Sequence, residues 1–433
     1  MLVFISDLHL VDETAGKHNI PADAFKIFLE NIKVHSDKTK NKDKEVKIVF
    51  LGDIFDLLRT EEWFKEKEED RPWGNNTEKM KKRAKIILEK IEKKNKETLN
   101  LLSKKELEKQ FKDTHVEIIY IPGNHDRLCC MIPELKEKVI KLLDLNTSNN
   151  ENFKHYFCDL KYGVYALHGH EFDSFNYAGG SEHNNNDYKV TPIGDLIATE
   201  IITKIPGKLI KKVESKKLLN EEDKIQLKNN FQEIDNVRPL NATLEWLLFQ
   251  IKENSDLKKI IQDSIIEVMQ GFDKLQYVKK YEKWYPFDTS DVVQYLCTAL
   301  QNIELFSSKY LLNILGNIFK TGGGIFDTKG STELLYNLVN KDHLNNINYI
   351  IMGHTHVPLQ RPVFYFNPEN RDKLKAIYFN TGTWRKTYYC YKCEEGICFT
   401  GRRNMNYVIL YSSKEKPNKC NLPVFETWIG REF

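Results

Sequence analysis

The stretch Leu2-Val3-Phe4-Ile5-Ser6-Asp7-Leu8-His9 decides the fold. Four apolar residues run directly into a serine, a carboxylate and an imidazole. A short apolar run without polar alternation is typical of a β-strand that is buried on both faces, as in a parallel sheet. The polar side chains then stand at the carboxyl end of the strand, which is where open α/β sheets bind their ligands.

The same arrangement, an apolar run followed by chemically active side chains, returns five times. The runs that we predict to be strands are Val46–Leu51, Val116–Ile121, Gly163–Leu167, Tyr349–Met352 and Ala376–Phe379. They lead into the segments Gly52-Asp53-Ile54-Phe55-Asp56, Gly123-Asn124-His125-Asp126, His168-Gly169-His170, Gly353-His354-Thr355-His356 and Asn380-Thr381-Gly382-Thr383. Because the carboxyl ends of parallel strands meet at one edge of a sheet, we expect all six polar segments on one rim, where they form a single site.

The first five of the six polar segments supply carboxylates, imidazoles and one carboxamide. These are the ligand types that a pair of divalent ions needs, and Mn²⁺, Fe²⁺ and Zn²⁺ all accept mixed carboxylate and imidazole ligands. Any one aspartate after a strand is more often a turn residue or a helix cap. It is the full ordered set that indicates a site for two metal ions.

In residue type and order, these segments resemble the core motifs of the calcineurin-like metallophosphoesterases. The resemblance implies an α/β (α+β sandwich) fold, in which mixed β-sheets are flanked by helices. It also implies hydrolysis of a phosphate ester by a hydroxide that bridges two divalent ions, with Mn²⁺ favoured and Fe²⁺ or Zn²⁺ as alternatives. One ion would be bound by Asp7, His9, Asp53 and His356, and the other by Asp53, Asn124, His168 and His354.

The resemblance also implies roles beyond metal binding. His125 is the candidate general acid that protonates the leaving oxygen, and Asp56 is the candidate carboxylate that orients it. His170 is expected to contact substrate or to form a hydrogen bond only. Arg127 is expected to bind phosphate or to form a surface salt bridge. Asp126 is expected to cap the following helix or to support the site from outside it.

Three branches of the superfamily share parts of the pattern. The segments that contain Asp7, Asp53 and His354 resemble the UDP-diacylglucosamine pyrophosphatases of lipid A synthesis, but those usually have Arg in place of His125 and Asp in place of His170. The same segments resemble DNA-repair nucleases, which Gly123-Asn124-His125-Asp126 fits better. Ser/Thr protein phosphatases fit less well, because an Arg-Gly pair is missing after Asp56 and Asp126 replaces the usual Glu.

We therefore expect a metal-dependent phosphohydrolase that cleaves a phosphodiester or pyrophosphate bond in a phosphorylated small-molecule or amphiphilic substrate. A nuclease of the same chemistry is the alternative. A non-catalytic scaffold is a third hypothesis, and it is disfavoured because Asp53, Asn124 and His125 are all present.

Residues 174–340 contain none of the six polar segments. We predict that residues 1–173 and 341–433 form the catalytic core and that residues 174–340 are a helical insertion that caps the site. A stripe from Ile193 to Ile205 is expected to pack onto the core, with an acyl-chain pocket or a membrane surface as alternatives. A second predicted helix, Tyr310–Phe319, precedes three glycines.

Two further patterns concern local structure. Apolar residues at helical spacing from Met80 to Leu102 predict one amphipathic helix on the core. After Trp384 the chain is typical of antiparallel β-structure. There we predict a hairpin of Thr387–Tyr391 with Ile397–Gly401, and later strands at Tyr407–Tyr411 and Val424–Ile429.

Composition limits the partners and the compartment. The net charge of +3, from 65 basic and 62 acidic residues, argues against wholesale coating of nucleic acid, although a local basic groove would be compatible with it. No apolar run is long enough to span a bilayer, and Met1 leads directly into the first strand, so we expect a cytoplasmic protein, with peripheral membrane association as an alternative. The eight cysteines are then expected to be free thiols. A zinc site of Cys390, Cys393, Cys398 and Cys420 is a disfavoured alternative.

Overall fold

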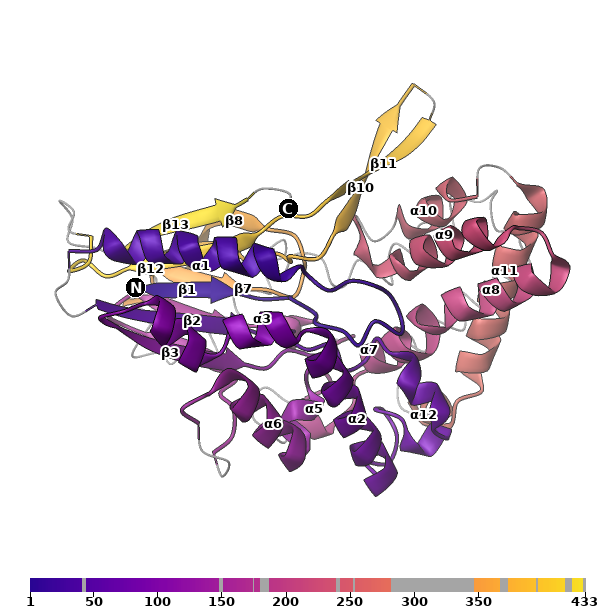
Figure 1. The fold of residues 1–433 in the computed structure, drawn as a ribbon, viewed down its shortest axis with the longest axis horizontal. Helices are drawn as coiled ribbons and strands as arrows, with labels where there is room; N and C mark the ends of the chain where they lie inside the picture. The colour runs from indigo at the N-terminus through magenta and orange to yellow at the C-terminus, as the bar shows by residue number, and fades with distance from the viewer. Residues whose placement is uncertain are drawn as a thin grey trace.

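A computed structural model shows a mixed α/β protein, which confirms the fold class (Figure 1). Two five-stranded sheets form the core, and a helical lobe stands beside it on the right of Figure 1. The structure describes residues 1–40, 44–147, 151–173, 175–179, 187–238, 242–251, 254–281, 346–366, 373–394, 396–416 and 423–430.

The first sheet has the strand order β13-β12-β1-β2-β3. Strands β1, β2 and β3 are mutually parallel, whereas β12 and β13 are antiparallel additions at one edge. The strands are β1 (Leu2–Ile5), β2 (Lys44–Leu51), β3 (Thr114–Ile121), β12 (Asn406–Tyr411) and β13 (Val424–Ile429). All five had been predicted, and their positions are confirmed.

The second sheet has the order β4-β5-β7-β9-β8, in which β5, β7 and β9 are parallel and the two edge strands are antiparallel. Its strands are β4 (Tyr156–Asp159), β5 (Val164–Leu167), β7 (Tyr349–Met352), β8 (Leu359–Phe366) and β9 (Lys373–Asn380). The three parallel strands had been predicted. The edge strands β4 and β8 had not, because neither is a continuous apolar run.

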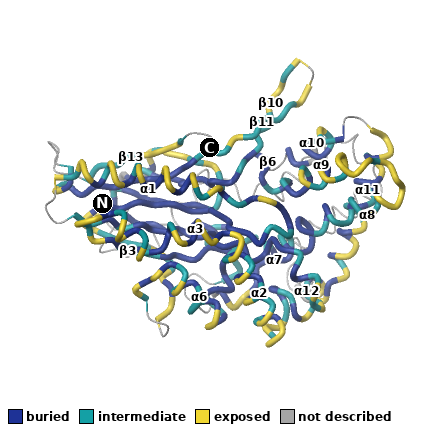
Figure 2. Tube along the Cα trace, viewed as in Figure 1, coloured by how far each residue is buried: buried dark blue, intermediate teal, exposed yellow. Residues whose placement is uncertain are grey.

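Both faces of the central strands are buried, as the apolar runs predicted (Figure 2). Along β1, Leu2 and Phe4 point into the layer between the two sheets, where they meet Ala166 and Ile351 of the second sheet. The alternate residues, such as Val3, face helices instead. This alternation makes one strand a member of two hydrophobic cores.

Helices cover the outer face of the first sheet. They are α1 (Ala22–Asp37), α2 (Glu78–Lys94), α3 (Lys96–Leu101), α4 (Lys104–Gln110), α5 (Leu128–Met131) and α6 (Pro133–Leu143). The single helix predicted from Met80 to Leu102 is therefore wrong in one respect, because it is broken at Asn95. The buried Asn95 amide donates to the carbonyls of Val11 and Ile91, which holds the chain at the break.

The helical lobe, which we call the cap, contains α7 (Ile193–Leu196), a π-helical segment (Ile197–Ile202), α8 (Lys204–Lys216), α9 (Glu221–Gln232), α10 (Thr243–Phe249), α11 (Ser255–Asp273) and α12 (Gln276–Tyr281). Most of the predicted stripe is buried in a hydrophobic cluster made mainly of cap side chains, rather than against the two core sheets. This burial also removes the stripe from any membrane surface. The predicted helix Tyr310–Phe319 lies outside the described residues.

The cap cluster takes side chains from beyond residues 174–340 as well. The hairpin of β10 (Thr387–Cys393) and β11 (Gly396–Arg402), predicted as such, leans over the cap (Figure 1). The Trp246 ring lies 4.3 Å from that of Tyr388 and 5.2 Å from that of Phe399, between ring centroids. A short cap strand, β6 (Val237–Arg238), pairs with β10 and completes a third sheet.

The cysteine prediction needs a correction. Cys393 and Cys398 form a disulfide across the β10–β11 hairpin, so these two are not free thiols, and the zinc set that includes them is not formed. The hairpin register pairs Cys393 with Gly396 and Cys398 with Tyr391, so the two cysteines are diagonal neighbours across the hairpin. Cys390 is unpaired, and Cys420 lies outside the described residues.

Among the described helices, none has both the length and the apolar character needed to cross a membrane.

Candidate metal centre

The six polar segments lie together, as predicted, but they follow strands of two sheets rather than one. The segments after β1, β2 and β3 come from the first sheet, and those after β5, β7 and β9 come from the second. The parallel strands of both sheets end at the same place, so their carboxyl ends face each other across the site. The packing of the two sheets therefore brings together the six polar segments, which we had predicted to lie along the edge of one sheet.

Three overlapping groups of three side chains could each hold a metal ion, with candidate ligand atoms within 4.8 Å of one another. One of them, His9, Asp53 and His125, shares His9 with the first of the other two and Asp53 with the second. The first is Asp7, His9 and His356, in which His356 Nε2 lies 3.3 Å from an Asp7 carboxylate oxygen. The second is Asp53, His168 and His354, in which His168 Nε2 lies 3.2 Å from Asp53 Oδ2.

Asp53 lies between the two groups. Its Oδ2 is 3.6 Å from His9 Nε2 of the first group as well as close to His168 of the second. A carboxylate in this position can contact both ions, which is the role predicted for it. Asn124 also fits a ligand role, because its amide nitrogen donates to Asn176 while its Oδ1 is buried without a hydrogen-bond partner.

The backbone at the candidate ligands is unusual. Asp7, His9, Asp53, His354 and His356 all have positive φ angles, between 43° and 70°. They make up five of the ten non-glycine residues with this conformation in the part of the chain that is described. Side chains disfavour the left-handed region, and such residues gather at functional sites.

Glycines of the same motifs leave room for these ligands. A Cβ atom on Gly52 would collide with the His168 ring, and one on Gly123 would collide with the Asp53 carboxylate. A Cβ on Gly353 would meet the Asp7 carboxylate in the same way. The glycines therefore permit a close approach of loops that belong to different strands.

Neighbouring polar groups fix the orientation of the ligands. His168 Nδ1 donates to the Leu51 carbonyl at 2.8 Å, which directs its Nε2 toward Asp53. His354 Nε2 is 3.0 Å from a carboxylate oxygen of the buried Asp173, which leaves Nδ1 of this ring as its ligand atom. Such outer partners set the tautomer of a metal-binding histidine.

The segment after β9 supports the loop that carries Asp7. Thr383 Oγ1 donates to the Asp7 carbonyl at 2.6 Å, and Thr381 Oγ1 lies 2.5 Å from Ser6 Oγ. Asp126 supports the neighbouring loops, since its carboxylate accepts from the Gly123 and Ile54 amides. The helix-capping alternative for Asp126 is not what the structure shows.

His125 and Asp56 lie as predicted for an acid and the carboxylate that orients it. His125 Nδ1 is 2.9 Å from Asp56 Oδ1, and the other Asp56 oxygen is 3.3 Å from His9 Nδ1. Burial alone would lower the pKa of His125, but the charges of Asp56 and Asp53 outweigh it and raise that pKa to about 9. His125 therefore carries a proton near neutral pH, and its side chain is still 19% exposed toward the pocket.

The carboxylates are correspondingly acidic. Burial opposes the charged form of Asp53, yet the charges of His168 and His125 hold its pKa well below the usual range. Hydrogen bonds from His356 and His9 keep the pKa of the buried Asp7 below its usual value in the same way. The centre is thus a set of ionised carboxylates surrounded by imidazoles, and a divalent cation that binds there would replace the protons on those imidazoles.

Two predicted substrate residues lie elsewhere. Arg127 is not on the surface, and it does not line the pocket. Its guanidinium is buried, pairs with Asp195 at 2.6 Å and donates to the Tyr188 and Pro72 carbonyls, so its donors are used inside the protein. His170 is buried behind the centre, with its ring 5.3 Å from that of His168, and it too is absent from the pocket lining.

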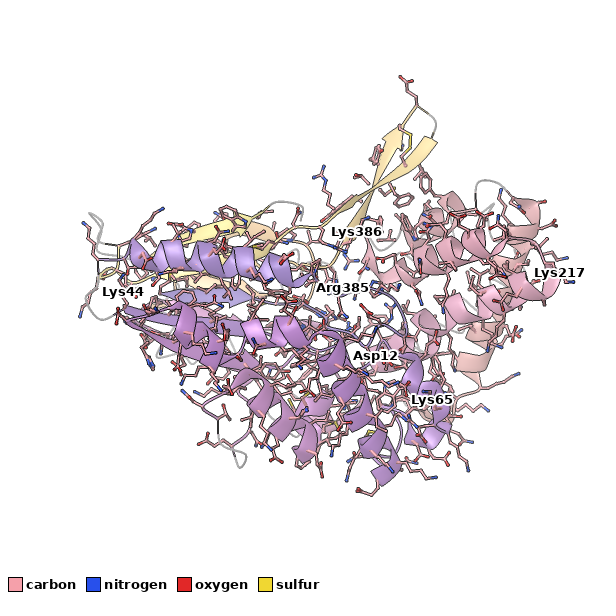
Figure 3. The ribbon with its side chains drawn as sticks, viewed as in Figure 1. Asp12, Lys44, Lys65, Lys217, Arg385 and Lys386 are labelled. Carbon is pink, nitrogen blue, oxygen red and sulfur yellow. A yellow bond between two sulfur atoms is a disulfide. The ribbon has the colours of Figure 1, made fainter. Side chains whose placement is uncertain are left out.

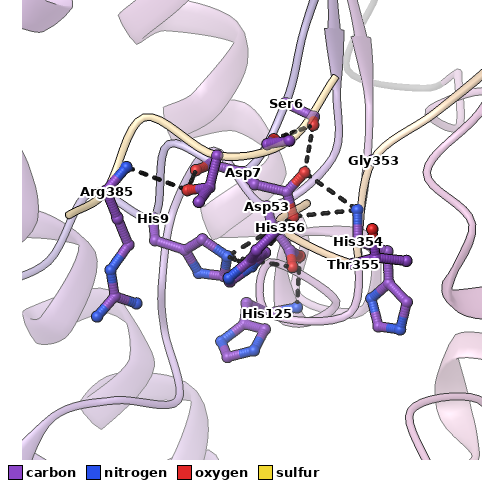
Figure 4. Close-up of polar contacts among 12 residues, drawn as sticks. Ser6, Asp7, His9, Asp53, His125, Gly353, His354, Thr355, His356 and Arg385 are labelled. Carbon is purple, nitrogen blue, oxygen red and sulfur yellow. Dashed lines mark hydrogen bonds and ion pairs between the residues drawn. The ribbon is translucent and has the colours of Figure 1, made fainter. Parts of the chain in front are cut away.

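The centre opens into a pocket of about 190 Å³ between the core and the cap. Its lining includes His9, Asp53, Asn124, His125, His354 and His356 from the centre, Ile197, Ala198 and Ile202 from the π-helical segment, and Arg59, Arg238 and Arg385. Figure 4 shows the side chains of the centre converging from separate loops. Asp173 and the three arginines were not predicted from the sequence, although Arg59 lies only three residues after Asp56.

No protein-family model and no curated protein sequence matches this chain.

Proposed function

We propose that this protein is a phosphohydrolase of the calcineurin-like metallophosphoesterase type, which uses two divalent ions to hydrolyse a phosphodiester or pyrophosphate bond. The observation that carries the proposal is the placement of Asp53 between two groups of candidate ligands, beside a histidine that Asp56 orients.

The side chains fit such a metal pair in number and in chemistry. Mixed carboxylate and imidazole ligands suit Mn²⁺, Fe²⁺ and Zn²⁺, and the buried Asn124 Oδ1 has no other partner in the described structure. When bound, a pair of such ions would acidify a water molecule and neutralise charge on the phosphate.

The chain's own residues would supply the proton for the leaving group. The charges of Asp56 and Asp53 favour the protonated form of His125. Its Nδ1 is engaged by Asp56, so Nε2 is the nitrogen from which a proton would pass to a leaving oxygen in the pocket. Asp56 holds the ring in that orientation and stabilises its charge. General acid catalysis of this kind contributes about 10²–10⁴-fold in rate.

The pocket favours a small or amphiphilic substrate over nucleic acid. A volume of about 190 Å³ accepts a phosphate with a limited substituent, and Ile197 and Ile202 give it one apolar wall. The nuclease alternative predicts salt-sensitive DNA binding, with affinity that falls steeply as salt rises. The cytoplasmic location stays a prediction from the sequence.

The test is an assay of the purified chain, stripped of metal and then reloaded with Mn²⁺, on bis(p-nitrophenyl) phosphate and p-nitrophenyl phosphate. We expect release of p-nitrophenol that requires the metal and that is faster with the diester. If the protein binds two Mn²⁺ ions but hydrolyses neither these compounds nor a panel of diphosphates, the enzymatic proposal is wrong and the scaffold hypothesis gains.

A further inference from the structure

Three arginines line the same pocket as the candidate metal ligands. Arg59 and Arg385 come from the core, and Arg238 ends β6 of the cap. The pairing of β6 with β10 brings Arg238 close to Arg385, which precedes β10 by two residues. Figure 3 places Arg385 where the core meets the cap, and in Figure 4 its guanidinium extends to the same side of the site as the His125 ring.

All three arginines are more than nine-tenths buried. Arg59 is 2% exposed, Arg385 is 1% exposed and Arg238 is 7% exposed. Burial lowers the pKa of Arg238 to about 10, so this residue is still a cation at neutral pH. Three buried positive charges in one pocket need anionic partners, because an uncompensated charge in a protein interior is costly.

Few carboxylates pair directly with this arginine cluster. Asp235 pairs with Arg59 and lies 3.4 Å from Arg385, so two guanidinium groups share one carboxylate. Asp53 and Asp173 also line the pocket, but they lie against His168 and His354, at 3.2 Å and 3.0 Å. In the part of the chain that the structure describes, Arg238 forms no ion pair with a carboxylate.

Several guanidinium nitrogens are also without hydrogen-bond partners. Among the described residues, none accepts from the buried Nε atoms of Arg59, Arg238 and Arg385 or from Nη2 of Arg385. Buried polar groups are normally satisfied, so each such donor calls for a specific explanation. A planar guanidinium fork matches the oxygens of a phosphate group, and several forks together hold it by charge-assisted hydrogen bonds.

We propose that the arginine cluster of Arg59, Arg238 and Arg385 binds a second phosphoryl group of the substrate, while the metal centre binds the one that is hydrolysed. This inference rests on the proposed function and narrows its substrate class. The substrate carries two phosphoryl groups close enough to occupy one pocket, and its apolar part lies toward Ile197 and Ile202.

The first experiment uses the metal-free protein, so that it does not depend on catalysis. Binding of inorganic phosphate is measured by titration calorimetry for the wild type, for Arg385→Gln and for Arg402→Gln, an exposed arginine on β11 that serves as control. We expect saturable binding that weakens about tenfold or more in Arg385→Gln, the loss expected for a charge-assisted contact, and that is unchanged in Arg402→Gln. Absence of phosphate binding by the wild type, or equal binding by all three proteins, overturns the proposal.

A second variant guards against loss of binding through misfolding. Asp235→Asn removes the carboxylate that competes with a bound anion for Arg59 and Arg385, so phosphate should bind more tightly than to the wild type. A misfolded protein cannot produce such a gain. Weaker phosphate binding in a folded Asp235→Asn protein would instead assign the arginine cluster a purely structural role. Acetate, tested in parallel, should bind weakly if the cluster fits a tetrahedral dianion rather than a carboxylate.

The third measurement concerns the substrate. The compound 3-hydroxypropyl p-nitrophenyl phosphate is compared, on the Mn²⁺-loaded enzyme, with the same compound carrying a phosphate on its hydroxyl group. We expect a higher kcat/KM for the compound with the extra phosphate, and we expect this preference to shrink about tenfold in Arg385→Gln. If phosphate binds the metal-free protein but neither ester is cleaved, the hydrolase proposal fails while the anion site stands. If both esters are cleaved with equal efficiency, the anion site has no part in substrate recognition.

Discussion

The two sides of the pocket are built in different ways. On the metal side, each candidate ligand comes within a few residues of the end of a buried strand, and the two sheets bring these strand ends together. On the arginine side, guanidinium groups from three separate parts of the chain meet around Asp235, and one of them comes from the cap. The two sheets therefore fix the candidate metal centre, whereas the docking of the cap against the core fixes which side chains lie beside it.

The largest expected effect is on the metal side. Asp53→Asn removes the charge shared by both ligand groups, so metal-dependent turnover should fall by more than about a hundredfold, beyond the loss typical of an outer partner. The check is kcat/KM on the diester together with metal content by elemental analysis. Asp256→Asn, on the exposed first turn of α11, is the matched control. Near-wild-type turnover in Asp53→Asn would remove this residue from the centre.

Replacing the candidate acid should separate proton transfer from metal binding. His125→Ala should lower kcat about a hundredfold for an alkyl leaving group, and less for p-nitrophenol, which leaves without help from an acid. Metal content should stay at the wild-type level. A protein that loses metal when His125 is replaced would show that this histidine is a ligand.

The partner of His354 should have an intermediate effect. Asp173→Asn keeps the shape of the side chain but weakens the acceptor for His354 Nε2, so affinity for Mn²⁺ should fall about tenfold or more. Competition with a fluorescent chelator measures this affinity directly. Asp223→Asn, on the surface of α9, controls for the loss of a carboxylate. Unchanged affinity would mean that Asp173 only packs against the ring.

The smallest effect is expected on the apolar wall of the cap. Ile197→Ala should reduce the preference for hexyl p-nitrophenyl phosphate over its methyl analogue by severalfold to about tenfold, since one methylene in an apolar pocket is worth at least that much. Cleavage of the methyl compound serves as the internal reference. Ile225→Ala, at a position 60% exposed on α9, is the control. Equal preference in wild type and Ile197→Ala would place the substituent elsewhere.

The parallel strands could be predicted because their signal is local. Each is a continuous or nearly continuous apolar run, most of whose residues are buried, and all six predictions are confirmed. The edge strands β4 and β8 were not predicted, because they mix polar with apolar residues. Each forms its ladder with one adjacent strand, β5 or β9. The division of the motifs between two sheets was not predicted either, because the apolar runs do not show which strands are neighbours in a sheet.

The predictions for Arg127, His170 and the cysteines were corrected because contacts with distant residues place these side chains. Arg127 is next to the motif residues in sequence, but Asp195 of the cap engages its guanidinium. His170 is two residues from His168, yet its buried ring packs among those of His168, Tyr177 and Tyr188 and is absent from the pocket lining. Cys393 and Cys398 pair because of the hairpin register. In each case a tertiary contact decides between alternatives that sequence spacing leaves open.

The sequence alone determined which residue types stand at the ends of the strands, and hence the candidate ligands, His125 and Asp56. It could do so because strand and ligand are adjacent in the chain. Only the tertiary structure decided that two sheets share the candidate ligands, that Asp173 orients His354 and that three arginines converge beside them. These arrangements join residues that are far apart in sequence, and their geometry is set by sheet packing and by the docking of the cap.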